Sequence, residues 1–119
     1  MIKGIGLDIV ELDRVRNLLA RKPKFASRIL TPEEMEVFAS LGERRKTEWF
    51  AGRFSAKEAF SKAVGTGIGK GLSFQDISII QEKSGKPIVR HPYSYTAHLS
   101  ITHTSQYAAA QVILEDKTE

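Results

Sequence analysis

The feature that most restricts the fold of this 119-residue chain is a long stretch of helical periodicity in its middle. At about 100° per residue, residues 43–64 carry apolar side chains over more than half of the helix circumference. Gly65 follows at the position where a glycine ends a helix. The segment Glu43–Val64 therefore predicts the longest helix of the fold, against which a sheet packs. Its apolar arc contains Trp49, Phe50, Phe54, Ala56, Phe60, Ala63 and Val64.

Shorter patterns on both sides of this helix predict strands and further helices. Residues 2–12 alternate apolar side chains with glycine and acid at period two, which is typical of a strand. A strand, then helices, then consecutive strands predict one α+β domain over residues 1–119 with a largely antiparallel sheet. The other expected elements are a helix over Arg14–Ala20 capped by Asp13, a helix that starts at the N-cap Thr31 and ends near Leu41, strands over Asp76–Gln81 and Ile88–Arg90, and a terminal hairpin of Ala97–Thr104 and Tyr107–Glu115.

Composition excludes several classes of protein. The chain has no cysteine, which removes disulfides, thiolate metal sites and a cysteine nucleophile. No apolar run approaches the roughly 20 residues of a membrane span, and Asp8 lies where a signal peptide needs its apolar stretch. We therefore expect a soluble cytoplasmic protein that does not associate with membranes.

The net charge of +4 is concentrated near the N-terminus. Segment 14–28 contains six basic residues and no acid, and such a segment attracts anionic partners. The charge alone leaves open a nucleic acid, a membrane surface, an acidic protein or simply a solvated face. Phe25 is the only aromatic residue in the segment, which weakens stacking on single-stranded nucleic acid. The basic residues are Arg14, Arg16, Arg21, Lys22, Lys24 and Arg28.

Two acids and a lysine suggest phosphate chemistry. Asp8 lies between glycines in a short apolar strand, where an unpaired acid is costly. Glu58 and Lys62 are four residues apart on the long helix, which also suits a simple stabilising pair. A strand aspartate and a helix glutamate together form a plausible site for Mg²⁺, which often binds one or two carboxylates plus substrate phosphates.

Three further features have both a structural and a functional interpretation. Arg53 and Lys57 fall inside the apolar arc, where they either extend to solvent or meet a phosphate or carboxylate. The glycine-rich loop Gly65–Gly71 fits neither the P-loop nor the dinucleotide pattern, but its backbone N–H groups are able to contact phosphate. His103 ends a strand, either as a hydrogen-bonded structural residue or as a ligand-binding one.

In their order and spacing, these motifs resemble one family over nearly the whole chain. The chain opens on Gly4-Ile5-Gly6-Leu7-Asp8, continues through Lys57-Glu58-Ala59-Phe60-Ser61-Lys62 into Gly65-Thr66-Gly67, and later contains Ser100-Ile101-Thr102-His103. This pattern resembles the holo-[acyl-carrier-protein] synthase family, the short bacterial 4′-phosphopantetheinyl transferases. Thr102 replaces the serine that the family usually has there and keeps the hydroxyl.

The resemblance implies an enzyme of fatty acid biosynthesis that transfers 4′-phosphopantetheine from coenzyme A to a serine of apo-acyl carrier protein, leaving adenosine 3′,5′-bisphosphate. It also implies a 4′-phosphopantetheinyl transferase-like fold and a homotrimer with active sites between subunits. The matched positions are Asp8 and Glu58 for Mg²⁺, with Lys62 near the scissile pyrophosphate. The positions matched to coenzyme A binding are Arg53, Lys57, Gly65, Gly67 and His103. The positions matched to binding of the carrier are Arg14, Arg21 and Arg28. The general base remains open between Glu58, Asp8 and a metal-bound water.

Two rival functions use some of the same residues. A metal-dependent nuclease or phosphoesterase would use the acids and the basic segment for hydrolysis by water. A nucleic-acid-binding module would show salt-sensitive affinity and would give Asp8 no role. The resemblance favours the transferase, with no nucleic-acid partner.

Overall fold

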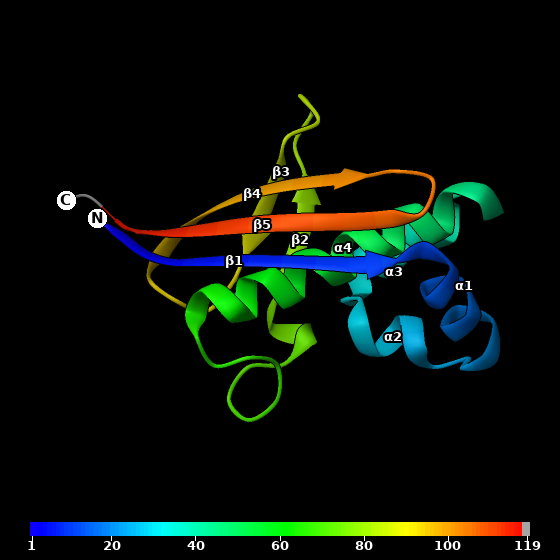
Figure 1. Ribbon diagram of the computed structural model, residues 1–119, viewed down its shortest axis with the longest axis horizontal. Helices are drawn as coiled ribbons and strands as arrows, with labels where there is room; N and C mark the ends of the chain where they lie inside the picture. Colours follow the sequence, from blue (N-terminus) through cyan, green and yellow to red (C-terminus); the bar gives the residue numbers. More distant parts are fainter. Residues whose placement is uncertain (118–119) are drawn as a thin grey trace.

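The long helix is present with the ends expected from the sequence, and it is the centre of the fold (Figure 1). The computed structural model describes residues 1–117. Helix α4 spans Glu43–Val64 and ends on Gly65, whose φ of 97° is left-handed. In chain order the other elements are β1 (Ile2–Glu11), α1 (Leu12–Arg21), α2 (Phe25–Ile29), α3 (Pro32–Ser40), a 3-10 turn (Phe74–Asp76), β2 (Ser78–Gln81), β3 (Pro87–Arg90), β4 (Tyr95–His103) and β5 (Tyr107–Asp116).

The strands form two antiparallel sheets, in agreement with the α+β prediction. The larger sheet has the order β1-β5-β4, and β2 and β3 form a separate hairpin. Helix α4 packs along one face of the larger sheet, and α1–α3 gather at one end of it (Figure 1). Both termini lie at the other end, where the N–H of Asp116 donates to the carbonyl of Met1.

Strand β1 lies directly against the backbone of α4. A Cβ placed on Gly6 would come within 1.8 Å of the carbonyl oxygen of Ala59, and one on Gly4 within 1.9 Å of that of Ala63. Only glycine permits this approach. Because side chains alternate along a strand, Asp8 continues the row of residues that face α4.

The opposite face of β1 carries the large apolar side chains. Ile5, Leu7 and Ile9 are 60%, 63% and 63% exposed. The predicted alternation is therefore present, and it turns glycine and aspartate inward and the aliphatic side chains outward. This face of β1 therefore presents a row of exposed aliphatic side chains.

A buried ion pair connects the long helix to the segments packed against it. The Nζ of Lys57 donates to Oε1 of Glu34 at 2.6 Å and to the carbonyl oxygen of Ile29 at 2.6 Å. Glu34 belongs to α3, and its other oxygen accepts from the N–H of Ile79 in β2 at 2.7 Å. The pair therefore holds four elements, α2, α3, α4 and β2, together inside the core.

The helix ends near the N-terminus differ in part from those expected. Thr31 caps α3 as predicted, and Glu34 completes the capping box. Helix α1, however, begins at Leu12, so Asp13 lies in its first turn and pairs with Arg16 instead of capping. Helix α2 was not predicted, since a single short turn has too few residues to show periodicity. Asp76 lies in the 3-10 turn and caps it together with Ser73, so the following strand starts later than expected.

Candidate functional site

The structure brings Asp8 and Lys62 together, as the sequence predicted. The Nζ of Lys62 lies 3.0 Å from Oδ1 of Asp8 and donates to the carbonyl oxygen of Leu7 at 3.0 Å. The second oxygen of Asp8 accepts from the hydroxyl of Ser55 at 3.1 Å. Two side chains of α4 therefore contact the two oxygens of one strand carboxylate.

Glu58 lies beside this cluster at a cleft. A cavity of about 560 Å³ is lined by Asp8 and Glu58 together with Arg14 of α1 and the apolar residues Val15, Leu18, Phe25 and Phe54. Burial raises the pKa of the Glu58 carboxyl, the charge of Asp8 raises it further, and Lys62 opposes the shift. Two carboxylates that repel each other at the edge of a cleft form a favourable place for a cation.

The side chains present fit a metal ion whose remaining coordination positions are filled by water and substrate phosphates. Within residues 1–117 no three His, Cys, Asp or Glu side chains cluster as metal ligands. Asp8 and Glu58 provide two carboxylates, which suits Mg²⁺ because this ion commonly keeps waters and binds substrate phosphates. Closed four-ligand sites, such as those of structural zinc, are not formed by these residues.

The glycine-rich loop continues from the helix end that carries Lys62. Gly65, Gly67, Gly69 and Gly71 all have positive φ, which explains why glycine recurs at every second position. The N–H of Gly65 donates to the carbonyl of Ser61, so the helix-capping interpretation of this glycine is confirmed. A contact between this loop and phosphate remains a prediction.

Arg53 and His103 form a second cluster elsewhere on the chain. The guanidinium of Arg53 lies 4.2 Å from the centre of the Trp49 ring, and burial lowers the Arg53 pKa to about 10. Nε2 of His103 lies 3.1 Å from Oε2 of Glu48. Both residues border a cavity of about 180 Å³. Among the described residues, Nε of Arg53 is the only buried side-chain nitrogen or oxygen without a hydrogen-bond partner.

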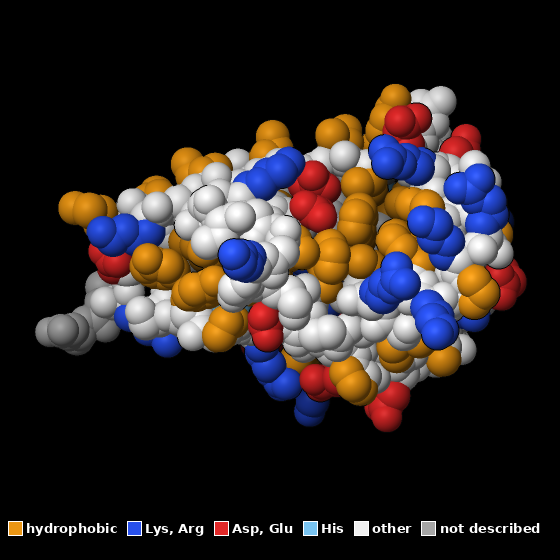
Figure 2. Space-filling view, turned by 90° about the horizontal axis from the view of Figure 1, so that it is seen from below, with side chains coloured by type: hydrophobic (Ala, Val, Ile, Leu, Met, Phe, Trp, Pro, Cys, Tyr) orange, Lys and Arg blue, Asp and Glu red, His pale blue; other side chains and the backbone are white. Residues whose placement is uncertain are grey.

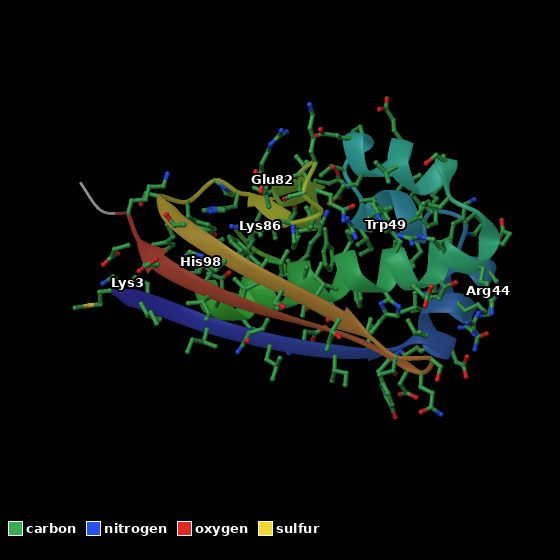
Figure 3. The ribbon with its side chains drawn as sticks, turned by 90° about the horizontal axis from the view of Figure 1, so that it is seen from above. Lys3, Arg44, Trp49, Glu82, Lys86 and His98 are labelled. Carbon is green, nitrogen blue, oxygen red and sulfur yellow. The ribbon has the colours of Figure 1, made fainter. Side chains whose placement is uncertain are left out.

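Asp8 and His103 lie at opposite edges of the larger sheet, and Arg53 lies on α4. Asp8 is on β1 and His103 is on β4, and β5 lies between these strands. Neighbouring strands are about 4.8 Å apart, so the backbones of these edges are separated by roughly 10 Å. Figure 3 shows Trp49 at the helical end of the molecule, remote from Lys3. The chain therefore presents the predicted site residues as two clusters that border different cavities.

Lys57 requires a correction. The sequence placed it among the coenzyme A contacts, but its side chain is 0% exposed. Its ammonium donates to Glu34, to the carbonyl of Ile29 and to the carbonyl of Phe74, which uses all three of its protons. A buried cation needs an anionic partner, and the partner of Lys57 is the carboxylate of Glu34 in the same chain.

The basic residues predicted to receive a partner are exposed around the helical end. Arg14, Arg21 and Arg28 are all accessible, and α1 reaches Arg21, so Arg14 and Arg21 share one helix face. Figure 2 shows lysine and arginine side chains around an apolar hollow at this end of the molecule. Arg14 borders the cavity that contains the two acids.

Sequence reasoning missed several partners at both clusters. Ser55 shares a face of α4 with Glu58 and Lys62, three and seven residues further on, and this spacing was available in the sequence. The pairs Lys57–Glu34 and His103–Glu48 join residues far apart in the chain, and no local pattern indicates them.

The fold and this site define an α+β protein whose paired carboxylates and lysine suit a phosphate-bearing substrate. Residues 4–112 match the family model of the 4′-phosphopantetheinyl transferase superfamily, and the chain belongs to this family. It is 57% identical over 117 residues to a holo-[acyl-carrier-protein] synthase of Bacillus subtilis, covering 97% of each sequence.

Solved structures agree with this assignment. A holo-(acyl-carrier-protein) synthase from Bacillus anthracis in complex with CoA (3′,5′-ADP) is 51% identical, with a TM-score of 0.93 over 98% of this chain and 99% of that one. The holo-[acyl-carrier-protein] synthase of Helicobacter pylori in complex with coenzyme A is 34% identical, with a TM-score of 0.82 over 93% of this chain and 99% of that one. No helix in the described part of the chain is long and apolar enough to cross a membrane.

Proposed function

We propose that this chain transfers 4′-phosphopantetheine from coenzyme A to a serine hydroxyl of apo-acyl carrier protein and releases adenosine 3′,5′-bisphosphate. The observation that carries the proposal is the cluster of Asp8, Glu58 and Lys62 beside a cleft bordered by Arg14. This cluster lies in a chain that is 51% identical to a synthase solved with CoA (3′,5′-ADP). Fatty acid biosynthesis as the process and the cytoplasm as the location follow from the same family membership and are part of the proposal.

The reaction is a displacement at phosphorus. The carrier serine oxygen attacks the phosphorus that bears the pantetheine arm, and the bond from that phosphorus to the departing adenosine bisphosphate breaks. Charge develops on the departing phosphate, so fixed positive groups and alignment supply most of the catalysis. Lys62, whose side chain is 52% exposed and whose ammonium lies 3.0 Å from Asp8, neutralises this charge.

Asp8 and Glu58 would hold Mg²⁺, which when bound supplies a Lewis acid for the pyrophosphate. The two side chains come from different elements, β1 and α4, whose backbones are in contact. The serine proton needs an acceptor. Burial raises the pKa of the Glu58 carboxyl, which makes it one candidate acceptor beside Asp8 and a bound water.

We propose that the complete site forms between subunits of a homotrimer. The exposed face that carries Ile5, Leu7 and Ile9 provides an apolar contact surface. Arg53 of α4 and His103 of β4 border a different cavity from the one that Asp8 lines, so a neighbouring subunit is able to present them to the same coenzyme A. A buried guanidinium nitrogen without a partner is costly, and a phosphate would satisfy it.

The carrier would dock on the exposed arginines of α1 and α2. Arg14 borders the cleft, so a partner bound there holds its serine near Asp8 and Glu58. Charged groups at the rim of an interface mainly accelerate encounter and orient the partner. An acidic carrier therefore suits this surface better than a neutral one.

One assay tests the function. The chain is mixed with apo-acyl carrier protein, coenzyme A and Mg²⁺, and the carrier is weighed by mass spectrometry. We expect the mass of phosphopantetheine to be added, and we expect Asp8→Asn and Glu58→Gln to lower the rate more than 100-fold while the circular dichroism spectrum is unchanged. Hydrolysis of coenzyme A or of nucleic acid without modification of the carrier would favour a phosphoesterase instead.

A further inference from the structure

Ser55 contacts Asp8 from inside the core. Its side chain is 0% exposed, and its hydroxyl lies 3.1 Å from Oδ2 of Asp8 and 3.0 Å from the backbone carbonyl oxygen of the same residue. The hydroxyl has one proton, and both acceptors within reach belong to Asp8. Whichever of them it serves, Ser55 restrains this residue and no other.

The geometry points to Ser55 as a positioning residue that sets the orientation of the Asp8 carboxylate toward a bound cation. This inference rests on the proposed function. Lys62 contacts Oδ1 and Ser55 contacts Oδ2, so donors on α4 hold both oxygens and fix the rotation of the carboxylate. Partners of this second layer orient metal ligands, and their removal typically lowers metal affinity about 10–100-fold.

The two donors differ in how they respond to substrate. Lys62 has a long side chain with 52% of its surface exposed, and a coenzyme A phosphate competes with Asp8 for its ammonium. Ser55 is enclosed by the core and has no path to solvent or substrate. Ser55 is therefore the donor that stays on Asp8 when Lys62 turns to phosphate, which is the moment when the carboxylate must be correctly placed.

The same helix offers a matched control. Ser61 is also 0% exposed, and its hydroxyl donates to the carbonyl oxygen of Glu58 at 2.7 Å, within its own helix. Ser55→Ala and Ser61→Ala each remove one buried hydroxyl from α4. Only the first removes a contact with Asp8.

The experiment measures metal binding directly. Mn²⁺ is titrated into the full-length chain loaded with 3′,5′-ADP and followed by electron paramagnetic resonance, and the Mg²⁺ concentration for half-maximal transfer is measured in parallel. We expect Ser55→Ala to weaken Mn²⁺ binding about tenfold and to raise the Mg²⁺ requirement equally, with kcat at saturating Mg²⁺ within about twofold of the parent. Ser61→Ala should stay within about twofold in every measurement.

Further outcomes distinguish a positioning role of Ser55 from a general structural effect and from failure of the proposed function. Ser55→Cys keeps the volume and donates weakly, so it should fall between serine and alanine, and it serves as the test if Ser55→Ala does not fold. Parental Mn²⁺ affinity in the Ser55 variants, equal losses in Ser55→Ala and Ser61→Ala, or no Mn²⁺ binding by the parent would overturn the inference. If the parent binds Mn²⁺ and loses it on substitution of Ser55 but transfers no phosphopantetheine, the proposed function fails and the positioning role stands.

Discussion

The ammonium of Lys57 and the carboxylate of Glu34 lie 2.6 Å apart in the core, and both side chains are almost completely shielded from solvent. Burial lowers the pKa of Lys57, and the hydrogen bond and charge of Glu34 oppose that shift. The adjacent residue Glu58 faces the candidate site, so the pair fixes the helix immediately beside it. Removal of one partner leaves the other charged and buried.

We therefore expect Lys57→Ala to destabilise the chain by about 3–5 kcal/mol, the range found when a buried ion pair loses one member. Unfolding in urea, followed by circular dichroism, measures this loss. Arg90→Ala is the control, because Arg90 pairs with Glu33 at 3.2 Å, both side chains are more than half exposed, and such surface pairs contribute about 0–1 kcal/mol. Equal losses of unfolding free energy in the two variants would show that other groups stabilise the buried Glu34 carboxylate when Lys57 is absent.

The raised pKa of Glu58 predicts a pH dependence of stability. A carboxyl whose pKa is higher in the folded state favours folding fully below its unfolded pKa, and this contribution is lost as the pH rises through the folded pKa. Glu58→Gln removes the titrating carboxyl, so the variant does not lose this contribution to stability as the pH rises. In the absence of metal, its Tm should match that of the parent near pH 4 and exceed it at pH 7, by on the order of 2 °C.

With Mg²⁺ and coenzyme A present at pH 7, the Tm of the parent should instead exceed that of Glu58→Gln, because a ligand that binds only the folded parent stabilises it. Differential scanning calorimetry at both pH values checks the prediction. A Glu58→Gln variant that is less stable than the parent at pH 7 without metal would contradict it.

The exposed face of β1 predicts how the chain associates. Leu7→Glu places a charge in the middle of the surface formed by Ile5, Leu7 and Ile9, so we expect a trimeric parent and a monomeric variant in light scattering. Transfer activity should fall at least tenfold, because the second cluster would no longer reach the acids. Val37→Glu on α3 is the control, since Val37 is also an exposed aliphatic residue but lies outside the sheet.

A shared site also predicts recovery of activity in mixed assemblies. Asp8→Asn and Arg53→Ala should each be nearly inactive alone. If each site takes Asp8 from one subunit and Arg53 from its neighbour, every trimer that contains both variants regains one intact site in three. The specific activity of assemblies purified through a different tag on each variant measures this, and no recovery would indicate that each subunit holds a complete site.

Charge reversal on α1 predicts a selective loss of carrier binding. Arg14→Glu should raise the KM for apo-carrier at least tenfold and leave the KM for coenzyme A nearly unchanged, because rim charges steer the partner and not the nucleotide. Added salt should reduce carrier binding by the parent in the same direction, and Arg14→Ala should lose less than Arg14→Glu. Steady-state transfer with each substrate varied in turn gives both constants.

Arg44→Glu makes the matched control for this prediction. Arg44 is exposed at the start of α4, far from the termini, and does not border the cleft (Figure 3). Weakened coenzyme A binding with normal carrier binding in Arg14→Glu would place α1 at the nucleotide and overturn the docking proposal.

The parts of the fold that local chemistry specifies were predictable from the sequence. Gly65 ended α4 and Thr31 started α3 where expected, because caps act on neighbouring backbone groups. Asp8 and Glu58 were singled out by residue type, but their association with Lys62 was expected from the family resemblance, because the Asp8–Lys62 contact joins residues 54 positions apart.

The remaining features depend on contacts between distant segments. The period-two pattern of β1 does not reveal which face of the strand turns toward the core. Here the close approach of Gly6 to Ala59 turns the glycine face inward, and the aliphatic side chains are therefore exposed. An apolar arc likewise does not reveal that Lys57 has a partner 23 residues away. Arg53 and His103 border one cavity and Asp8 lines another, and this arrangement depends on long-range packing that no local pattern contains.

The glycine contact between β1 and α4 has a mechanical consequence. Most elements in a protein are separated by side chains, which change rotamer and so act as a compliant layer between two backbones. Gly4 and Gly6 remove that layer, and the strand bearing Asp8 rests on the backbone of the helix bearing Glu58. The spacing of the two acids is thereby insulated from rearrangements in the rest of the core, and thermal motion carries strand and helix together as one stiff unit.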